Sequence, residues 1–344
     1  MPSCSLSALL ACLVCVLLGF VPSEKGLKDY YADYFTMGVA VAPRSLNGPD
    51  SALILRHFGS LTAENAMKMG PIHPEPNRYF WTDADAIAGF ARRHGLKMRG
   101  HTLCWHQQTP PWFFVDEAGK QVSKEILLQR LKAHIETVVG RYKGQIYAWD
   151  VVNEAIDDNN AKFWRESPFF QIAGEEYIAK AFEYAHAADP SALLFYNDYN
   201  TETPGKRERI FTLVKRLKEQ GVPIHGVGLQ GHWSIYGPKA IEIERSIERF
   251  ASLGLDVHVT ELDVSVYRSE SDRRDKRPDE ADAFTPEMEQ RQYAFYMAAF
   301  AALRNQRYRL SNVTFWNVSD RRSWLDNFPV RGRKNYPLLF DTNG

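Results

Sequence analysis

Two glutamates that close runs of strand-forming residues are the first candidates for chemistry. Glu154 stands in the segment WDVVNEA and Glu261 in the segment DVHVTELD. A buried strand gains nothing from an unpaired carboxylate at its tip, so each residue needs a partner or a task. Two carboxyl groups that face each other suit glycoside cleavage, in which one donates a proton and the other attacks the anomeric carbon. The structural alternative is that both are buried ions paired with Lys68, Arg99 or a histidine.

The rest of the chain alternates strand-like runs with helical patterns. Alternation of this kind implies parallel strands with right-handed crossovers, and eight such strands predict an α/β fold, the closed (β/α)8 TIM barrel. An open doubly wound sheet is the alternative. The predicted strands lie at 35–42, 61–67, 97–103, 146–154, 193–200, 226–232, 256–263 and 313–319, and the predicted helices at 83–94, 124–140, 174–188, 205–220, 239–252 and 286–303.

Polar or ionisable residues end nearly every predicted strand. In a parallel barrel the C-terminal ends of all strands meet at one mouth, where barrel enzymes place their active sites. A purely structural role would scatter such residues over both ends of the barrel. We therefore expect them to converge on one site. They are Glu64 and Asn65, His101, Asn153 and Glu154, Asn197 and Asp198, Gln230 and His232, Glu261 and Asp263, and Trp316.

Taken together, the motifs around these residues resemble glycoside hydrolase family 10, the endo-β-1,4-xylanases, over about residues 26–341. A chance match of so many motifs in this order is implausible. The motifs are LTAENAMK (61–68), GHTLCWHQQTPPWF (100–113), WDVVNEA (149–155), NDYN (197–200), GVGLQGHW (226–233), VTELDV (259–264) and FWNVSDRRSWL (315–325).

The resemblance implies a retaining enzyme in which Glu154 is the acid/base and Glu261 the nucleophile. Asn153 would bind the 2-hydroxyl of the sugar being cleaved, and Gln230 and His232 would hold Glu261 and that sugar. The other implied contacts to xylan and xylo-oligosaccharides are Glu64, Asn65, Lys68, His101 and Trp105 on the glycone side, Asn197 and Tyr199 where the aglycone side begins, and Trp316 and Trp324 around the −1 sugar. Indole rings suit the C–H faces of sugars, and polar side chains suit their hydroxyls.

Two other functions stay open at this point. A related barrel hydrolase could prefer β-1,4-glucan, and the space near the sugar's C5 would decide, because glucose carries an additional CH2OH group there. A protein that binds xylan without turnover would keep the same groove. The presence of both glutamates with Asn153 and His232 argues against binding alone, and release of reducing sugar would separate the two functions.

The sequence departs from the family pattern in three places. Asn317 stands where the family usually has Gly after the Trp, and its side chain could crowd the pocket or shift Trp316. The segment 268–283 is unusually charged, and we expect a mobile, solvated rim. The chain ends at Gly344, before the helix that normally follows strand eight. We therefore expect a barrel that lacks its last C-terminal helix and has an exposed apolar stripe between strands one and eight, unless another segment such as 26–35 covers it.

The N-terminal 23 residues are expected to be a signal peptide, with a membrane or lipid anchor as the alternative. Residues 8–21 form an apolar run that is short for a membrane span and typical of a signal-peptide core. Residues 24–344 then form one catalytic barrel that is secreted, periplasmic or held at the cell surface. Three of the four cysteines lie in the N-terminal segment, which leaves Cys104 alone in the body of the protein.

Composition and the remaining motifs argue against other partners. Lys+Arg and Asp+Glu both number 42, so no basic surplus points to nucleic acid. The stretch GVGLQG lacks a following helix, which makes a nucleotide site improbable. His101, His106, His232 and His258 show no metal-binding spacing. We expect a monomer with no cofactor, no metal and no obligate protein partner. His106 and His258 are expected to be structural residues. Asn312 and Asn317 begin glycosylation sequons that we expect to be inaccessible.

Overall fold

Eight parallel strands close into a barrel in the computed structural model, which describes residues 24–270 and 272–343. Neighbouring strands pair in chain order, and β10 closes the ring by pairing with both β1 and β8. The additional short strand β7 (His232–Ser234) pairs with β8. The barrel strands are β1 (Thr36–Val41), β2 (Ser60–Ala63), β3 (Lys97–Trp105), β4 (Ala148–Asn153), β5 (Leu193–Asp198), β6 (Gly226–Leu229), β8 (Asp256–Ser265) and β10 (Leu310–Phe315).

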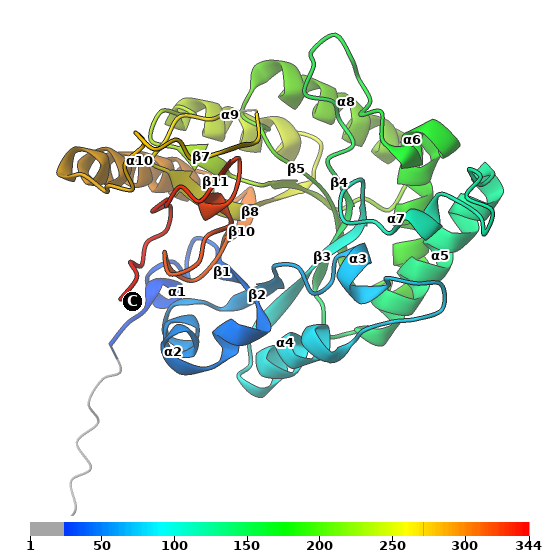
Figure 1. Cartoon of the computed structure of the whole chain (residues 1–344), viewed down its shortest axis with the longest axis horizontal. Helices are drawn as coiled ribbons and strands as arrows, with labels where there is room; N and C mark the ends of the chain where they lie inside the picture. Colours follow the sequence, from blue (N-terminus) through cyan, green and yellow to red (C-terminus); the bar gives the residue numbers. More distant parts are fainter. Residues whose placement is uncertain (1–23, 271, 344) are drawn as a thin grey trace, which may run out of the picture.

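Helices surround the barrel (Figure 1). Their sequences explain where they begin and which face they bury. Helix α5, for example, starts after Ser123, whose side chain accepts a hydrogen bond from Ile126 N. The same helix buries Leu127, Leu131 and Ile135, which recur at helical spacing. The longer helices are α2 (Gly48–His57), α4 (Thr82–Arg93), α5 (Lys124–Arg141), α7 (Glu176–Ala188), α8 (Pro204–Glu219), α9 (Ala240–Ala251) and α10 (Pro286–Asn305), and the short ones are α1 (Leu27–Tyr30), α3 (Met69–Ile72) and α6 (Pro168–Ala173).

The barrel predicted from the sequence is confirmed, with several local differences. The short helices α1, α3 and α6 were not predicted, and β2 ends at Ala63 instead of residue 67. The helix α2 was not predicted, because a single turn of polar residues with Gly48 and Pro49 precedes its short apolar run. Strand eight was placed too late, since β10 ends at Phe315 and the predicted extension to residue 319 forms bends and turns at the mouth of the barrel. Among the described residues, no helix is long and apolar enough to cross a membrane.

The surface between strands one and eight is partly covered. In the described part of the chain no α-helix follows β10, as expected. Residues 26–35 instead pack there: the ring of Tyr31 lies 5.3 Å from that of Phe300 on α10, and Phe35 is buried beside them. The C-terminal segment passes close to α1 and α2 in Figure 1, consistent with the contact of Phe340 and His57 at 4.8 Å.

Two large apolar side chains on α10 are exposed. Tyr293 and Met297 precede Phe300 on the same side of the helix, and they are 67% and 52% exposed. The predicted exposed stripe between strands one and eight is nevertheless wrong, because every apolar residue of β1 and β10 is buried and residues 26–35 pack over this surface.

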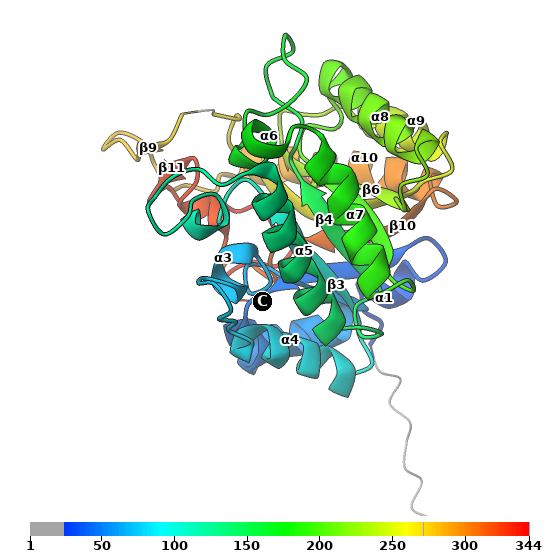
Figure 2. The ribbon, with the colours of Figure 1, turned by 90° about the vertical axis from the view of Figure 1, so that its right-hand side faces the viewer.

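The charged segment 268–283 is tied down more than a solvated rim would be. It contains the short strand β9 (Arg274–Asp275), which pairs with β11 (Val330–Arg331), and the two lie side by side in Figure 2. Arg274 forms ion pairs with Glu270 at 2.8 Å and Glu280 at 2.5 Å. The predicted signal peptide, residues 1–23, lies outside the described residues.

Candidate active site

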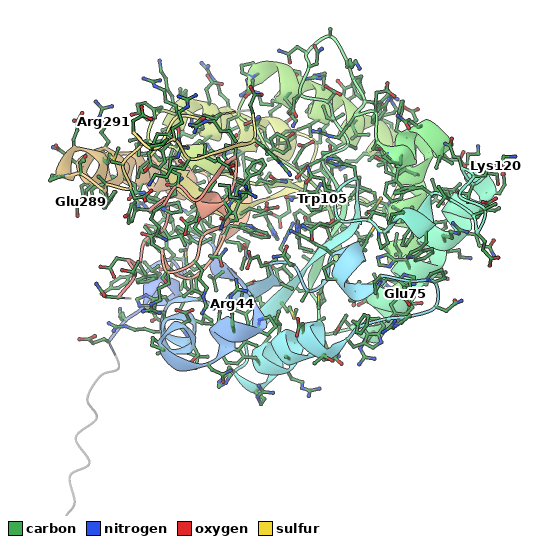
Figure 3. All side chains as sticks on the ribbon, in the orientation of Figure 1. Arg44, Glu75, Trp105, Lys120, Glu289 and Arg291 are labelled. Carbon is green, nitrogen blue, oxygen red and sulfur yellow. The ribbon has the colours of Figure 1, made fainter. Side chains whose placement is uncertain are left out.

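A cleft of about 900 Å³ opens where the barrel strands end. Figure 3 places Trp105 near the middle of the ring of helices, whereas Lys120, Glu289 and Arg291 lie at its periphery. All but one of the residues for which the resemblance implied a catalytic or substrate-binding role line this cleft, the exception being Asn197. The strand-end residues Asp198 and Asp263 do not line it either. The lining predicted residues are Glu64, Asn65, Lys68, His101, Trp105, Asn153, Glu154, Tyr199, Gln230, His232, Glu261, Trp316 and Trp324.

Glu154 follows directly after β4 in a left-handed backbone conformation, with φ of 58°. This conformation is costly for a residue with a side chain, so surrounding contacts must hold it. The backbone N of Glu154 donates to the carbonyl of Asn197 at 2.9 Å, and the hydroxyl of Tyr196 accepts from the next two backbone N–H groups. The strand therefore ends in a fixed turn that directs the carboxyl group into the cleft. A carboxylate that served only in a structural ion pair would not need this turn.

The carboxyl group of Glu154 is buried and surrounded by neutral donors. Its Oε1 accepts from Asn153 Nδ2 at 3.0 Å and from Gln230 Nε2 at 2.9 Å, and its Oε2 accepts from Trp105 Nε1 at 2.9 Å. Burial, followed by the negative charge of Asp198, raises the pKa of Glu154 above its ordinary value. A carboxyl group with a raised pKa can hold a proton and act as a general acid.

Glu261 is equally buried but lies among positive groups. Its Oε2 lies 3.2 Å from His232 Nε2, and its Oε1 accepts from Asn197 Nδ2 at 2.8 Å. Burial acts to raise the pKa of Glu261, but electrostatic attraction to His101, His232 and Lys68 outweighs it and lowers that pKa to about 2. The group is therefore ionised at neutral pH and available as a nucleophile.

His232 is held by two carboxylates at once. Its Nδ1 lies 3.0 Å from Asp263 Oδ2, opposite the contact of its Nε2 with Glu261. Burial lowers the pKa of His232, but these two carboxylates outweigh burial and raise the pKa to about 10. A positive His232 between two negative groups fixes the orientation of Glu261, as the resemblance implied.

Two asparagines connect the carboxyl groups of Glu154 and Glu261. Asn197 Nδ2 donates to Asn153 Oδ1 at 2.9 Å as well as to Glu261, while Asn153 Nδ2 donates to Glu154. Asn197 was predicted to lie where the aglycone side of the cleft begins. It is instead fully buried, and it holds the side chains of Asn153 and Glu261 in place. Gln230 also differs from its predicted role, because its side chain binds Glu154 and only its carbonyl accepts from the backbone N of Glu261.

The glycine at position 228 makes room for this network. A Cβ atom there would lie 2.1 Å from Asn197 Oδ1 and 2.9 Å from Thr260 Cγ2. Asn197 Oδ1 needs this space, because it accepts a hydrogen bond from Thr260 Oγ1 at 2.7 Å. The glycines of GVGLQG thus serve close packing inside the barrel, and β6 is followed by β7 with no intervening helix.

A buried ion pair beneath the cleft fixes His101. Asp150 accepts hydrogen bonds from both terminal nitrogens of Arg99, and its Oδ2 also lies 2.9 Å from His101 Nδ1. All three side chains are buried inside the barrel. Removing one member of such a group would leave an uncompensated buried charge, so each of the three side chains is needed to hold the others. Arg99 therefore pairs with Asp150 and not with either catalytic candidate.

Aromatic rings and Lys68 form the other walls around the carboxyl groups. Lys68 Nζ donates to Asn65 Oδ1 at 2.9 Å and lies 4.9 Å from the ring of Trp105. Trp324 Nε1 donates to Asp263 at 2.8 Å, which places its ring 4.8 Å from that of His232. Trp316 is buried and lies 5.3 Å from the ring of His101. Indole faces and polar hydrogen-bonding groups therefore alternate around the cleft.

The wall beside Glu154 contains residues that the sequence reasoning missed. Asp158 lines the cleft and accepts hydrogen bonds from Tyr199 and from Lys206, the latter at 2.8 Å. Arg165 donates to the carbonyl of Glu154 at 2.8 Å and to the hydroxyl of Tyr199, also at 2.8 Å. No motif marks these residues, because their roles depend on how a long loop folds over α8.

The position of Asn317 explains why glycine is usual there. Its φ is 120°, a conformation that side chains rarely adopt. Trp316 nevertheless lies in the cleft, so Asn317 strains the backbone without removing the ring from the site. Asn312 and Asn317 are 1% and 5% exposed, which confirms that both sequons are inaccessible.

His258 packs as the predicted structural residue, whereas His106 Nδ1 lies 4.0 Å from Glu154 Oε2 at the edge of the site. His258 is buried, with its Nε2 2.8 Å from the hydroxyl of Ser311, as predicted. His106 packs beside Trp105, and burial lowers its pKa to about 4. Within residues 24–270 and 272–343, no cluster of three or more His, Cys, Asp or Glu residues could hold a metal ion.

Comparison with known proteins gives one consistent result. Residues 26–344 match the family model of glycosyl hydrolase family 10. Endo-1,4-beta-xylanase B of Paenibacillus barcinonensis is 51% identical over 316 residues, which cover 92% of this chain and 93% of that protein. The beta-1,4-xylanase of Dictyoglomus thermophilum is 48% identical, covering 98% of this chain and 95% of its own.

Solved structures agree with the sequence comparisons. The crystal structure of xylanase XynB from Paenibacillus barcinonensis, complexed with a conduramine derivative, superposes with a TM-score of 0.89 at 50% identity, over 94% of this chain and 96% of its own. The structure of a variant in complex with xylotriose has a TM-score of 0.89 at 42% identity, over 93% of this chain and 96% of its own.

Proposed function

Because the chain belongs to glycosyl hydrolase family 10, we propose that it hydrolyses internal β-1,4-xylosidic bonds of xylan by double displacement. One observation carries the proposal: two buried carboxyl groups share a cleft, and their surroundings push their pKa values in opposite directions. A retaining glycosidase needs this difference, because one group must be protonated while the other is ionised. Glu154 has the surroundings of the acid/base, and Glu261 those of the nucleophile.

In the first step Glu261 attacks the anomeric carbon, and the bond from that carbon to the leaving oxygen breaks. Glu154 transfers its proton to the leaving oxygen, so that a neutral alcohol departs. Asn197 and His232 hold the attacking carboxylate in place through its two oxygens. Positioning of this kind lowers the barrier because the reacting atoms need no reorganisation. The product is a sugar bonded covalently to Glu261.

In the second step Glu154, now ionised, takes a proton from water. The resulting nucleophile attacks the anomeric carbon, the bond to Glu261 breaks, and the sugar leaves with the configuration it had at the start. Trp105 and Gln230 donate to the ionised form of Glu154 and stabilise it between the two steps. The residue thus serves as acid and then as base without moving.

The walls of the cleft suit a neutral sugar chain. Trp105, Trp316 and Trp324 offer flat apolar faces for sugar rings, and Asn153 offers an amide for the 2-hydroxyl of the sugar that is cleaved. Glu64, Asn65 and Lys68 supply further hydrogen-bonding groups on the glycone side. Xylan and xylo-oligosaccharides are therefore the proposed substrates, and β-1,4-glucan is the competing one.

We also propose that the enzyme is exported and works as a monomer. The apolar segment 8–21 supports export, as expected for an enzyme whose polymeric substrate cannot enter a cell. The two carboxyl groups and the hydrogen-bond partners that hold them are complete within a single chain, so the proposed chemistry needs no residue from a second subunit. N-terminal sequencing of the protein from culture medium and light scattering would test these two proposals.

Proton NMR during hydrolysis of xylo-oligosaccharide tests the mechanism. The β-anomer should form first and equilibrate later, and first formation of the α-anomer would refute retention. Parallel assays on xylan, cellulose and an aryl xylobioside should show preferred release of reducing sugar from xylan. Binding of xylan without release of sugar would instead support a binding protein.

A further inference from the structure

Beyond the rings already described, an aromatic ladder continues from Trp324 towards the rim of the cleft. The ring of Phe328 stacks on Trp324 at 5.0 Å with an interplanar angle of 22°. The guanidinium carbon of Arg273 lies 5.0 Å from the ring centroid of Phe328. All three residues line the same cleft as Glu261. The ladder therefore begins at the catalytic group and ends in a cation at the surface.

Arg273 differs from Arg274 and Arg333, whose charges are paired with carboxylates. Arg274 is paired with Glu270 and Glu280, and Arg333 lies 2.7 Å from Glu270. Within residues 24–270 and 272–343, no carboxylate lies within 4 Å of the guanidinium of Arg273. The charge of Arg273 thus remains available to a ligand in the cleft.

The contact with Phe328 leaves the hydrogen-bonding groups of Arg273 unused. The guanidinium lies 5.0 Å from the Phe328 ring, and it makes no side-chain hydrogen bond or ion pair to another residue within 24–270 and 272–343, so its N–H groups are free to bind a ligand. A planar fork of N–H groups matches the two oxygens of a carboxylate. An unbranched xylan chain carries no charge, so Arg273 has a charged ligand only if the chain bears an acidic side group.

We propose that Arg273 binds the carboxylate of a uronic acid side group on xylan, and so makes the enzyme prefer acidic xylan near this end of the ladder. The inference rests on the proposed xylan hydrolysis. In this arrangement Trp324 and Phe328 support the sugar chain, and Arg273 contacts the group that branches from it. Arg273 acts as a specificity residue and takes no part in bond cleavage.

The test compares three substrates: linear xylohexaose, glucuronoxylan, and the same glucuronoxylan after chemical reduction of its carboxylates to CH2OH groups. Arg273→Gln should lower kcat/KM on glucuronoxylan about fivefold, which corresponds to the upper range for an exposed ion pair, about 1 kcal/mol. It should leave kcat/KM on the reduced polymer and on xylohexaose unchanged. Added salt should reduce the wild-type preference for the acidic polymer, because exposed charges are screened.

The matched control is Arg277→Gln, in the same loop. Arg277 is exposed and does not line the cleft, so its replacement should change none of the three values. Equal loss by Arg273→Gln on native and reduced polymer, or no loss on either, would overturn the proposal. Failure of the wild-type enzyme to cleave xylohexaose would refute the proposed function itself, which keeps the two outcomes distinct.

Discussion

Replacement of Gly228 by alanine should damage catalysis through a residue that never touches substrate. The added Cβ atom would lie 2.1 Å from Asn197 Oδ1, whereas a comfortable contact needs about 3.5 Å. The amide of Asn197 must therefore move by about 1 Å. That movement disturbs its hydrogen bonds to Glu261 and Asn153, which measure 2.8 and 2.9 Å.

The expected cost divides into stability and rate. Overpacking of a full interior costs about 1–3 kcal/mol of folding free energy. Misplacement of a catalytic group by about 1 Å lowers the rate about 100-fold, equivalent to about 2.7 kcal/mol in the activation barrier. We therefore expect Gly228→Ala to remain folded at room temperature while kcat on xylohexaose falls about 100-fold.

Steady-state kinetics and thermal melts measured together would test this reasoning. The control is Gly140→Ala on α5, where a Cβ atom meets nothing within 4 Å. Because alanine favours a helix over glycine by about 1 kcal/mol, this variant should be slightly more stable and fully active. A folded Gly228→Ala variant whose kcat stays within twofold of the wild type would show that the position of Asn197 does not control Glu261.

Three further predictions concern single side chains. Glu154→Ala should lower kcat/KM at least 100-fold more for xylo-oligosaccharides than for activated aryl xylobiosides, since only the former need a proton donor; equal losses would contradict its role as acid. Asp198→Asn removes a negative charge that raises the pKa of Glu154, so the alkaline limb of the pH–kcat profile should move to lower pH, and an unmoved limb would count against this assignment. Asn317→Gly should relieve a strained φ of 120° and stabilise the fold by about 1 kcal/mol; an unchanged or lower melting temperature would mean that the Asn side chain compensates.

The sequence predicts the catalytic groups better than it predicts their supports. Glu154 and Glu261 could be located because a carboxylate at the end of an apolar strand is conspicuous, and the fold brings such ends together. The buried role of Asn197 could not be predicted, because it depends on whether the side chain faces the cleft or the space opened by Gly228. Chain position alone does not distinguish these two directions.

Contacts between distant segments were the hardest to predict. Asp158 and Arg165 join the active-site wall through a loop whose path no local pattern determines. The covering of Phe300 by Tyr31 depends on contact between the two ends of the barrel, which are more than 250 positions apart in the chain. Helix α2 was missed because its apolar run is short, and tertiary packing, not local propensity, stabilises it.

The central claim is that Glu261 becomes covalently bonded to the sugar. A 2-deoxy-2-fluoro xylobioside with a good leaving group tests this claim most directly. The fluorine slows both the formation and the hydrolysis of the covalent intermediate, whereas the good leaving group speeds its formation. The intermediate therefore accumulates. Mass spectrometry of the digested enzyme should then find one added 2-deoxy-2-fluoroxylobiosyl group, on the peptide that contains Glu261. Attachment to Glu154, or turnover of natural substrate by a Glu261→Ala variant, would contradict the mechanism.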